Sequence, residues 1–285
     1  MALTRCCGIT RKRVRCSITA TSRLADDWGR LIGAPLQHGG KYCRLHSRPF
    51  CALPADDCVG PAVVVLLDLE TTGVDVATDQ IVEIAAYHAP SERAARGAAF
   101  STVVKATALD TAFHVHGIEA DEIAQGPQFG VVWPRFVKYV EELQRLSVPE
   151  HSDSECEDAP VRLPFEAPSV ILAAHNGIKF DFAMILFECA RHGCSWASFE
   201  NWLFVDTLSI VQSVGATLGG CAKLQCLVRG RCAELQAHRA LDDCIALRAV
   251  LQHLADLLGI HILDVLRPFA MKLDVHASIA HMSTM

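Results

Sequence analysis

Apolar runs of strand length alternate with helix-like patterns through the middle of the chain. Strands are expected at 62–69, 80–88, 99–105, 169–174 and 202–206, and helices at 129–146, 180–192, 207–214, 219–228 and 239–258. The run from Val63 to Leu67 is continuous rather than alternating, which is typical of a central strand covered on both faces. Strands followed by helices predict an α/β fold, with a mixed sheet flanked by helices.

Composition divides the chain into three regions. Residues 1–58 are rich in Cys, Arg, Gly and His, residues 59–262 carry the regular apolar pattern, and residues 263–285 have none and are expected to form a tail. Within the middle region, acidic residues and prolines gather at about 147–168, which is typical of a surface insertion. A protein partner could bind at this acidic insertion.

The formal net charge of −6 is unevenly distributed. Residues 1–50 contain ten Lys/Arg and two Asp/Glu, so the remaining residues are strongly acidic. A basic region can attract phosphate backbones, whereas the acidic remainder argues against non-specific polyanion binding by the whole surface. No apolar run reaches the roughly eighteen residues that a bilayer span needs, and thirteen cysteines are an odd number. We expect an intracellular protein with reduced thiols and no membrane segment, whose compartment (nuclear, cytoplasmic or mitochondrial) stays open.

Two carboxylates come at the end of the first expected strand. Asp68 and Glu70 are two residues apart, so on an extended strand they project from one face while Leu69 points the other way. Two acids at the end of a buried strand repel each other and lose hydration unless cations neutralise them. The pair therefore indicates a metal site; the alternative is a strand that runs out into a solvated acidic turn.

Two further acids lie near expected helix starts. Asp181 follows an apolar strand and the polar turn 175–177, where an α/β sheet presents side chains at its carboxyl edge, although it could instead interact only with the helix dipole. Asp243 falls on the apolar stripe of helix 239–258, whereas Asp242 falls in its polar arc. Because a carboxylate on a buried stripe is costly without a cation, Asp243 is the functional candidate.

His238 precedes Asp243 by five residues. On one continuous helix the two side chains would point about 140° apart, so a shared site requires His238 to lie in the loop or cap before the helix. The alternative is an ordinary histidine with a structural partner.

The four acids Asp68, Glu70, Asp181 and Asp243 carry a formal charge of −4, which two divalent cations would balance. Oxygen ligands favour Mg²⁺ or Mn²⁺ over zinc. Two such ions can stabilise the attacking and leaving oxygens of an in-line phosphoryl displacement, and His238 can deprotonate the attacking water. The expected reaction is metal-assisted hydrolysis of a phosphodiester.

Three segments together resemble the motifs of the DEDDh (DnaQ-like) exonucleases, a family that includes the polymerase III proofreading subunit and the three-prime repair exonucleases. The segments are Asp68-Leu69-Glu70-Thr71-Thr72-Gly73, then His175-Asn176-Gly177 with Phe180-Asp181, then His238-Arg239-Ala240-Leu241-Asp242-Asp243. The resemblance covers about 62–255 and implies an RNase H-like fold, two Mg²⁺ or Mn²⁺ ions, and removal of nucleotides from 3′ ends as 5′-monophosphates. It assigns the metal carboxylates to Asp68, Glu70, Asp181 and Asp243, and the general base to His238.

The same resemblance suggests residues that bind the substrate. Thr71 and Asn176 belong to the motifs themselves. The segment from Phe113 to Ile118 looks like the family's His-Gly-Ile segment beside the terminal nucleotide, which makes His116 and Ile118 candidates. Their alternative is a turn before the next helix.

Residues 1–58 contain cysteines and a histidine at a spacing that is typical of zinc ligands. Cys43 and His46 are separated by two residues, a spacing at which both can bind one Zn²⁺, and Cys7 with Cys16 would complete a Cys₃His site. A region of this size with few large apolar residues needs a structural metal ion or a comparable cross-link to fold alone. We therefore expect a small structural zinc module, whose surrounding arginines would contact nucleic acid.

Three alternatives stay open for this region. Cys6 or Cys51 could replace one of the zinc ligands. The first 25 residues contain Arg, Ser and Thr but no acid, which is also typical of a transit peptide. The basic run Arg11 to Arg15 could serve as a nuclear import patch.

The expected function is 3′-to-5′ exonuclease activity on single-stranded ends, with DNA as the first substrate and DNA repair as the setting. Trimming of RNA is the alternative, because one or two contacts decide whether a 2′-hydroxyl is accepted. A non-catalytic adaptor that only binds nucleic acid is an alternative of another class, and the intact set of acids with His238 argues against it. Oligomeric state is not predicted.

Overall fold

The computed structural model describes residues 50–52, 62–89, 99–147, 168–195, 197–214, 221–228 and 238–273. The expected zinc ligands Cys7, Cys16, Cys43 and His46 lie outside the described residues, as does 148–167 of the acidic insertion. The strands are β1 (Phe50–Ala52), β2 (Ala62–Thr71), β3 (Ile81–His88), β4 (Ala99–Val103), β5 (Ser169–Ala174), β6 (Trp202–Asp206) and β7 (Met271–Leu273).

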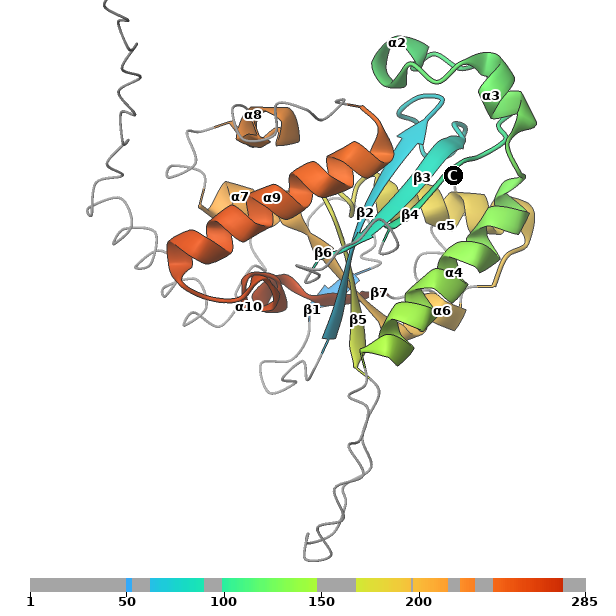
Figure 1. Cartoon of the computed structure of the whole chain (residues 1–285). Coiled ribbons are helices and arrows are strands. Elements are labelled where there is room, and N and C mark those ends of the chain that lie inside the picture. The colour runs from blue at the N-terminus through green and yellow to red at the C-terminus, as the bar shows by residue number, and fades with distance from the viewer. Residues whose placement is uncertain are drawn as a thin grey trace, which may run out of the picture.

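The seven strands found among the described residues form one mixed sheet with the order β1-β7-β6-β5-β2-β3-β4 (Figure 1). β2, β5 and β6 run parallel to one another, and the other neighbouring strands are antiparallel. The helices are α2 (Phe113–His116), α3 (Ala120–Gln125), α4 (Phe129–Leu146), α5 (Asp181–His192), α6 (Ala197–Asn201), α7 (Thr207–Ser213), α8 (Leu224–Val228), α9 (Ala240–Leu258) and α10 (Ile262–Leu266), followed by the 3₁₀ turn η2 (Arg267–Phe269).

Helices cover both faces of the sheet, so β2 is buried from two sides. Val63 and Val65 enter the core beneath α4 and α5, whereas Val64 and Leu66 enter the core beneath α7, α9 and α10. Asp68, two residues after Leu66, continues the face that α9 covers. The expected central strand and the expected sheet with flanking helices are confirmed.

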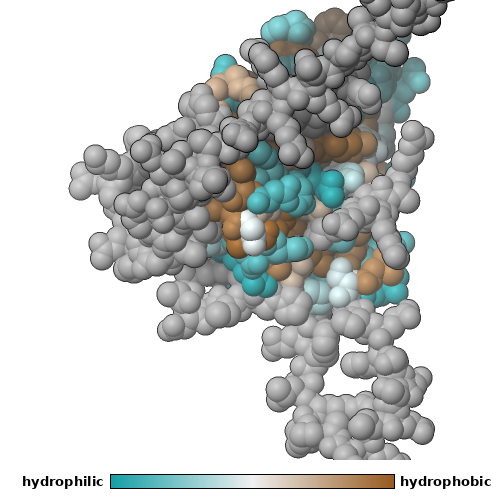
Figure 2. All heavy atoms as spheres, turned by 60° about the vertical axis from the view of Figure 1, so that its left-hand side comes forward, coloured by the Kyte–Doolittle hydropathy of each residue, from teal (hydrophilic) through white to brown (hydrophobic). Residues whose placement is uncertain are grey.

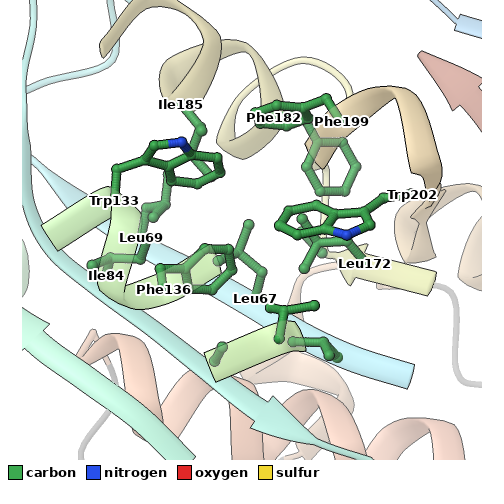
Figure 3. Packing of buried hydrophobic residues seen from close by; sticks show 14 of the residues in the cluster. Leu67, Leu69, Ile84, Trp133, Phe136, Leu172, Phe182, Ile185, Phe199 and Trp202 are labelled. Atoms are coloured by element: carbon green, nitrogen blue, oxygen red, sulfur yellow. The ribbon is translucent and has the colours of Figure 1, made fainter. Parts of the chain in front are cut away.

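An aromatic core holds α4, α5 and α6 against one face of the sheet (Figure 3). Trp133 stacks on Phe136 and Phe199 with ring centroids 5.3 Å and 5.2 Å apart. Trp202 of β6 meets Trp133 and Phe136 edge to face. Because α5 is packed into this core, its first residue is held at a defined place above the end of β5.

The opposite face is covered by α9, which runs across β2 and β3. The thiol of Cys244 lies 3.6 Å from the carbonyl oxygen of Leu66 and 3.5 Å from that of Ala85. Arg248 donates from Nε to the carbonyl oxygen of Ala89 at 3.0 Å. Figure 2, in which the side carrying α7, α9 and α10 comes forward, shows hydrophilic residues beside hydrophobic ones, as expected for an amphipathic helix whose polar arc stays on the surface.

The expected elements agree closely with the structure wherever an apolar pattern is long. α4, β5 and β6 have the expected bounds, and α5 and α9 each begin one residue later than expected. The short helices α2, α3 and α6 were not predicted, because one or two turns give too few apolar positions to show a period. The described part of helix 219–228 forms only at Leu224–Val228.

The sheet also extends beyond the expected domain limits. β1 lies within the region assigned to the zinc module, and α10 with β7 lies at the boundary and in the expected tail, yet β7 pairs with both β6 and β1. Strands of three residues are too short to show an alternating pattern in the sequence. β7 joins the sheet by pairing with the edge of β6, and β1 joins it by pairing with β7. β1 and β7 are therefore strands of one sheet although they lie beyond the predicted boundaries at 58 and 262, and the division of the chain into domains stays a prediction.

Among the described helices, none is by itself long and apolar enough to cross a membrane; the pair Ala240–Leu258 and Ile262–Phe269 meets that test only when taken together, across a 95° bend.

The aromatic core makes a prediction about stability. Phe136 is completely buried, so Phe136→Ala should lower the free energy of unfolding by about 3–5 kcal/mol. Val131 lies on the same helix with 46% of its surface exposed, and Val131→Ala should change that free energy by less than about 0.5 kcal/mol. Urea denaturation of the two variants measures the difference, and equal effects would contradict the described packing.

Candidate active site

Side chains from three elements meet at the edge of the sheet where the parallel strands end. Asp68 and Glu70 lie near the end of β2, and Asp181 begins α5 directly after β5 and its turn. Asp243 is in the first turn of α9. The topology thus brings together acids that are far apart in the sequence.

Distances and electrostatics show that these acids converge. One ligand atom each from Glu70, His238 and Asp243 lies within 4.8 Å of the others. Glu70 and Asp243 are each 8% exposed, and Asp181 is 3% exposed. The partly buried carboxyl of Asp68 is close enough to Asp181, Asp243 and Glu70 for each of them to raise its pKa.

The acids are held where their charged forms are disfavoured. Burial raises the pKa of Asp68 well above its usual value, and the neighbouring acids raise it further. Burial, followed by the charges of nearby carboxyls, raises the pKa of Glu70 to about 8. Burial is also the main cause that raises the pKa of Asp181 to about 7 and that of Asp243 above its usual range. Protons or cations must therefore accompany this cluster at neutral pH.

The cluster fits divalent cations better than lysine or arginine partners. Within the described part of the chain, no lysine or arginine forms an ion pair with Asp68, Glu70, Asp181 or Asp243. Buried carboxylates without a cationic partner are rare in proteins unless a metal ion meets them. The donor set is a candidate metal site, in which oxygen atoms are joined by the imidazole of His238.

His238 lies outside α9, as its angular offset from Asp243 requires. The N-cap of α9 is Arg239, and His238 comes just before it with a left-handed backbone, φ 65°. The backbone N–H of His238 donates to Oδ2 of Asp243 at 3.2 Å. This turn brings the imidazole to the side of the helix that carries Asp243, and the expected place of His238 is confirmed.

Glu83 and Arg239 form an ion pair beside the four acids. This ion pair was not predicted from the sequence. Glu83 of β3 lies directly opposite Glu70 of β2 and is 2% exposed. Its carboxylate accepts from Nε and Nη2 of Arg239 at 3.1 Å and 2.8 Å, and from the backbone N–H of Ala240 at 3.0 Å. The sequence does show Glu83 as an acid within an otherwise apolar strand. Asp243 was identified in a similar way, as an acid on the apolar stripe of a helix.

Asp206 at the end of β6 shapes the turn before Asp181. Its Oδ1 accepts from the backbone N–H of Asn176 at 2.9 Å and caps α7 through Leu208 N–H at 3.0 Å. Asn176 itself has a left-handed φ of 70°. This acid was also missed, although an acid between an apolar strand and a helix is a recognisable N-cap signal.

Gly177 in the same turn is required by close packing. A Cβ at this position would come within 2.8 Å of the Cβ of Ala174 and of the ring of Phe182. Neither neighbour can move easily, because both are completely buried. The glycine therefore lets the turn press against the core and delivers Asp181 to the site.

Most of the residues expected to bind substrate make internal contacts. Thr71 is buried and its hydroxyl donates to the carbonyl oxygen of Gly73 at 2.6 Å. His116 and Ile118 are 2% and 1% exposed; one ring nitrogen of His116 faces Asp110, and the other accepts from the N–H of Ile118. In this structure the fold itself occupies these groups, and their contact with substrate stays a prediction.

Sequence and structure comparisons identify proteins similar to this chain. Residues 65–152 match the family model RNase_T, described as Exonuclease. The exonuclease DPD1, chloroplastic/mitochondrial, of Arabidopsis thaliana is 30% identical over 227 residues, which cover 76% of this chain and 64% of that protein. The chain thus spans less than two thirds of the length of this curated relative.

Two solved structures share the fold. E. coli exonuclease I in complex with a dT13 oligonucleotide is similar with a TM-score of 0.53 and 17% identity, covering 70% of this chain and 42% of that one. The cell-death related nuclease CRN-4 is similar with a TM-score of 0.50 and 16% identity, covering 68% of this chain and 64% of that one. At such identities these similarities show the fold alone, and they confirm the expected mixed sheet flanked by helices.

The raised pKa values predict how stability depends on pH in the absence of divalent ions. The folded state raises the pKa of Glu70 from 4.5 to about 8, so between these values it binds protons that the unfolded chain has released. The free energy of unfolding should therefore fall as the pH rises through this window. Thermal unfolding in EDTA at a series of pH values measures the slope, and added Mg²⁺ should reverse the loss by binding the folded state.

A variant pair isolates the contribution of the cluster. Glu70→Gln removes one crowded carboxyl, so its stability should fall less steeply with pH than that of the wild type. Glu142→Gln removes an exposed carboxyl that pairs with Lys138 on the surface of α4, and it should keep the wild-type slope. Parallel curves for all three proteins would contradict a crowded acidic cluster.

Proposed function

The chain belongs to the DEDDh family of exonucleases, and from that premise we propose that it is a metal-dependent 3′-to-5′ exonuclease. The observation that carries the proposal is the convergence of Glu70, His238 and Asp243 within 4.8 Å, beside the partly buried Asp68 and the buried Asp181. The reaction is hydrolysis of the terminal phosphodiester, with release of nucleoside 5′-monophosphates.

Each residue of the cluster has a distinct proposed role. Asp68, Glu70, Asp181 and Asp243 would hold two Mg²⁺ or Mn²⁺ ions, which supply positive charge to the attacking and leaving oxygens. His238 accepts the proton of the attacking water at its imidazole, the general-base role that histidine serves near neutral pH. The buried surroundings strengthen these electrostatic interactions by excluding water.

Exposed apolar side chains beside the site support a single-stranded substrate. Val74 follows the motif of β2 and is 86% exposed, while Leu109 and Phe113 are 83% and 45% exposed. The N–H and hydroxyl of Thr111 donate to the carbonyl oxygen of Thr72, which ties the segment of Leu109 and Phe113 to the end of β2. Unpaired bases can stack on an aromatic ring such as that of Phe113 without a sequence preference, and the two aliphatic side chains offer apolar contact beside it.

We propose DNA as the first substrate and RNA as the alternative. The similar exonuclease I was solved in complex with a DNA oligonucleotide. Discrimination between the two requires a contact that accepts or excludes a 2′-hydroxyl. Rates on DNA and RNA strands of one sequence decide the order, and a higher rate on RNA would replace DNA as the substrate.

Asp243 provides the test of catalysis. With a 5′-labelled single strand and Mg²⁺, the wild type should produce a ladder of stepwise shorter products, and EDTA should abolish it. Asp243→Asn should lower the rate by more than about 100-fold. This is more than the usual effect of changing a residue that only supports a metal ligand, which is about 10–100-fold. His238→Ala should lower it by about 10²–10⁴-fold, the typical contribution of a general base.

Asp242 is the matched control, because it is adjacent to Asp243 but only partly buried, on the polar side of α9. Asp242→Asn should keep a rate close to that of the wild type. Immediate release of the labelled nucleotide would indicate attack at the 5′ end and contradict the polarity. Binding of the strand without any shortening by the wild type would favour the adaptor instead.

For residues 1–58 we propose a structural zinc module with ligands Cys7, Cys16, Cys43 and His46, which would add a basic contact to nucleic acid. Metal analysis of the reduced full-length chain should find one zinc per chain. Cys43→Ser should lower that content, because it removes a ligand from the most closely spaced pair. A folded chain without zinc would leave the transit peptide and the nuclear import patch as the interpretations of this region.

A further inference from the structure

We propose that Glu83 and Arg239 are positioning residues, which hold His238 and Asp243 in the arrangement needed for catalysis. Neither side chain belongs to the set of proposed metal ligands or to the general base. This inference rests on the proposed exonuclease function and concerns how the same site is assembled.

The ion pair joins β3 to the segment before α9. Two nitrogens of Arg239 and the backbone N–H of Ala240 donate to the carboxylate of Glu83 at 2.8–3.1 Å. The carboxylate is 2% exposed, so it depends on these donors to replace its hydration. A bidentate contact fixes the orientation of the Arg239 guanidinium relative to the Glu83 carboxylate as well as the distance between them, which a single hydrogen bond does not.

Both catalytic candidates are attached directly to this anchored segment. His238 immediately precedes Arg239 and has the left-handed backbone, which costs free energy unless its surroundings enforce it. The N–H of Asp243 donates to the carbonyl oxygen of Arg239 at 3.0 Å, and the N–H of His238 donates to the carboxylate of Asp243. Fixing Arg239 and Ala240 on β3 therefore fixes the imidazole and the carboxylate together.

The pair also balances charge next to the metal site. Glu83 lies directly opposite Glu70 across the β2 and β3 pairing, where like charges repel. Burial and the neighbouring carboxyls raise the pKa of Glu70, and Arg239 acts in the opposite direction. Glu83 thus supplies the anchor for the loop, while Arg239 compensates the charge that this anchor brings.

Steady-state kinetics of Glu83→Gln, Arg239→Ala and the double variant test the proposal. Each single variant should lower kcat by about 10–100-fold, because displacement of about 1 Å costs that much, while KM stays within about 3-fold. The double variant should be no slower than the slower single variant, since either change already breaks the same pair. Unchanged kcat in both single variants would overturn the proposal.

Arg248→Ala is the matched control for general loosening of α9. Arg248 also joins this helix to the sheet, through the carbonyl oxygen of Ala89 and the ring of Tyr87, but it lies nine residues further along the helix. Its loss should lower thermal stability with kcat close to the wild-type value. If Arg248→Ala lowered kcat as much as Arg239→Ala, the ion pair would be only one of several supports of the helix.

Two further measurements separate positioning from folding. Methylguanidinium in solution should restore part of the kcat of Arg239→Ala and none of that of His238→Ala. In the metal-free protein, the imidazole NMR signal of His238, identified by its loss in His238→Ala, should shift in Glu83→Gln and stay in place in Arg248→Ala. An unmoved signal in Glu83→Gln would overturn the proposal, whereas an inactive wild type would instead overturn the exonuclease function.

Discussion

The main electrostatic constraint on this structure is that four carboxylates, which repel one another, lie close together at the end of β2. Asp68, Glu70, Asp181 and Asp243 lie in low-polarity surroundings that raise the pKa of each acid. Glu83 adds a fifth acid, and among the described residues it is the one of these five that forms an ion pair with an arginine. The fold tolerates this crowding because hydrophobic packing on both faces of the sheet holds the elements that carry the acids.

Three of the four acids predicted from the sequence, Asp68, Glu70 and Asp243, interrupt or end an apolar pattern, whereas Asp181 was predicted from its place after an apolar strand and a polar turn. Asp243 was found because it lies on the buried stripe of α9, and the structure leaves it 8% exposed. Asp68 and Glu70 were found because they end a continuous apolar strand. Glu83 interrupts β3 in the same way and was missed, since its partner Arg239 is 156 residues away in the sequence. A local pattern shows that a buried charge needs a partner but not which residue provides it.

Features that depend on short segments or on tertiary pairing could not be predicted. β7 has three residues and belongs to the sheet only because β6 offers it an edge. His116 matched a family segment, yet the structure directs its ring toward Asp110 and the backbone of Ile118. Sequence similarity identifies the segment, whereas the direction of a side chain depends on contacts made after the chain has folded.

The position of the acidic insertion has a consequence for the tolerance of the domain to change. The insertion precedes β5, so it joins the sheet at the amino end of that strand, and the turn leading to Asp181 leaves from the other end. Six residues of β5 separate the two ends by about 17 Å. Residue 168, where the described chain resumes after the insertion, and Asp181 are therefore connected to opposite ends of β5. A change confined to 148–167 leaves the sequence of β5 and of the turn that leads to Asp181 as it is.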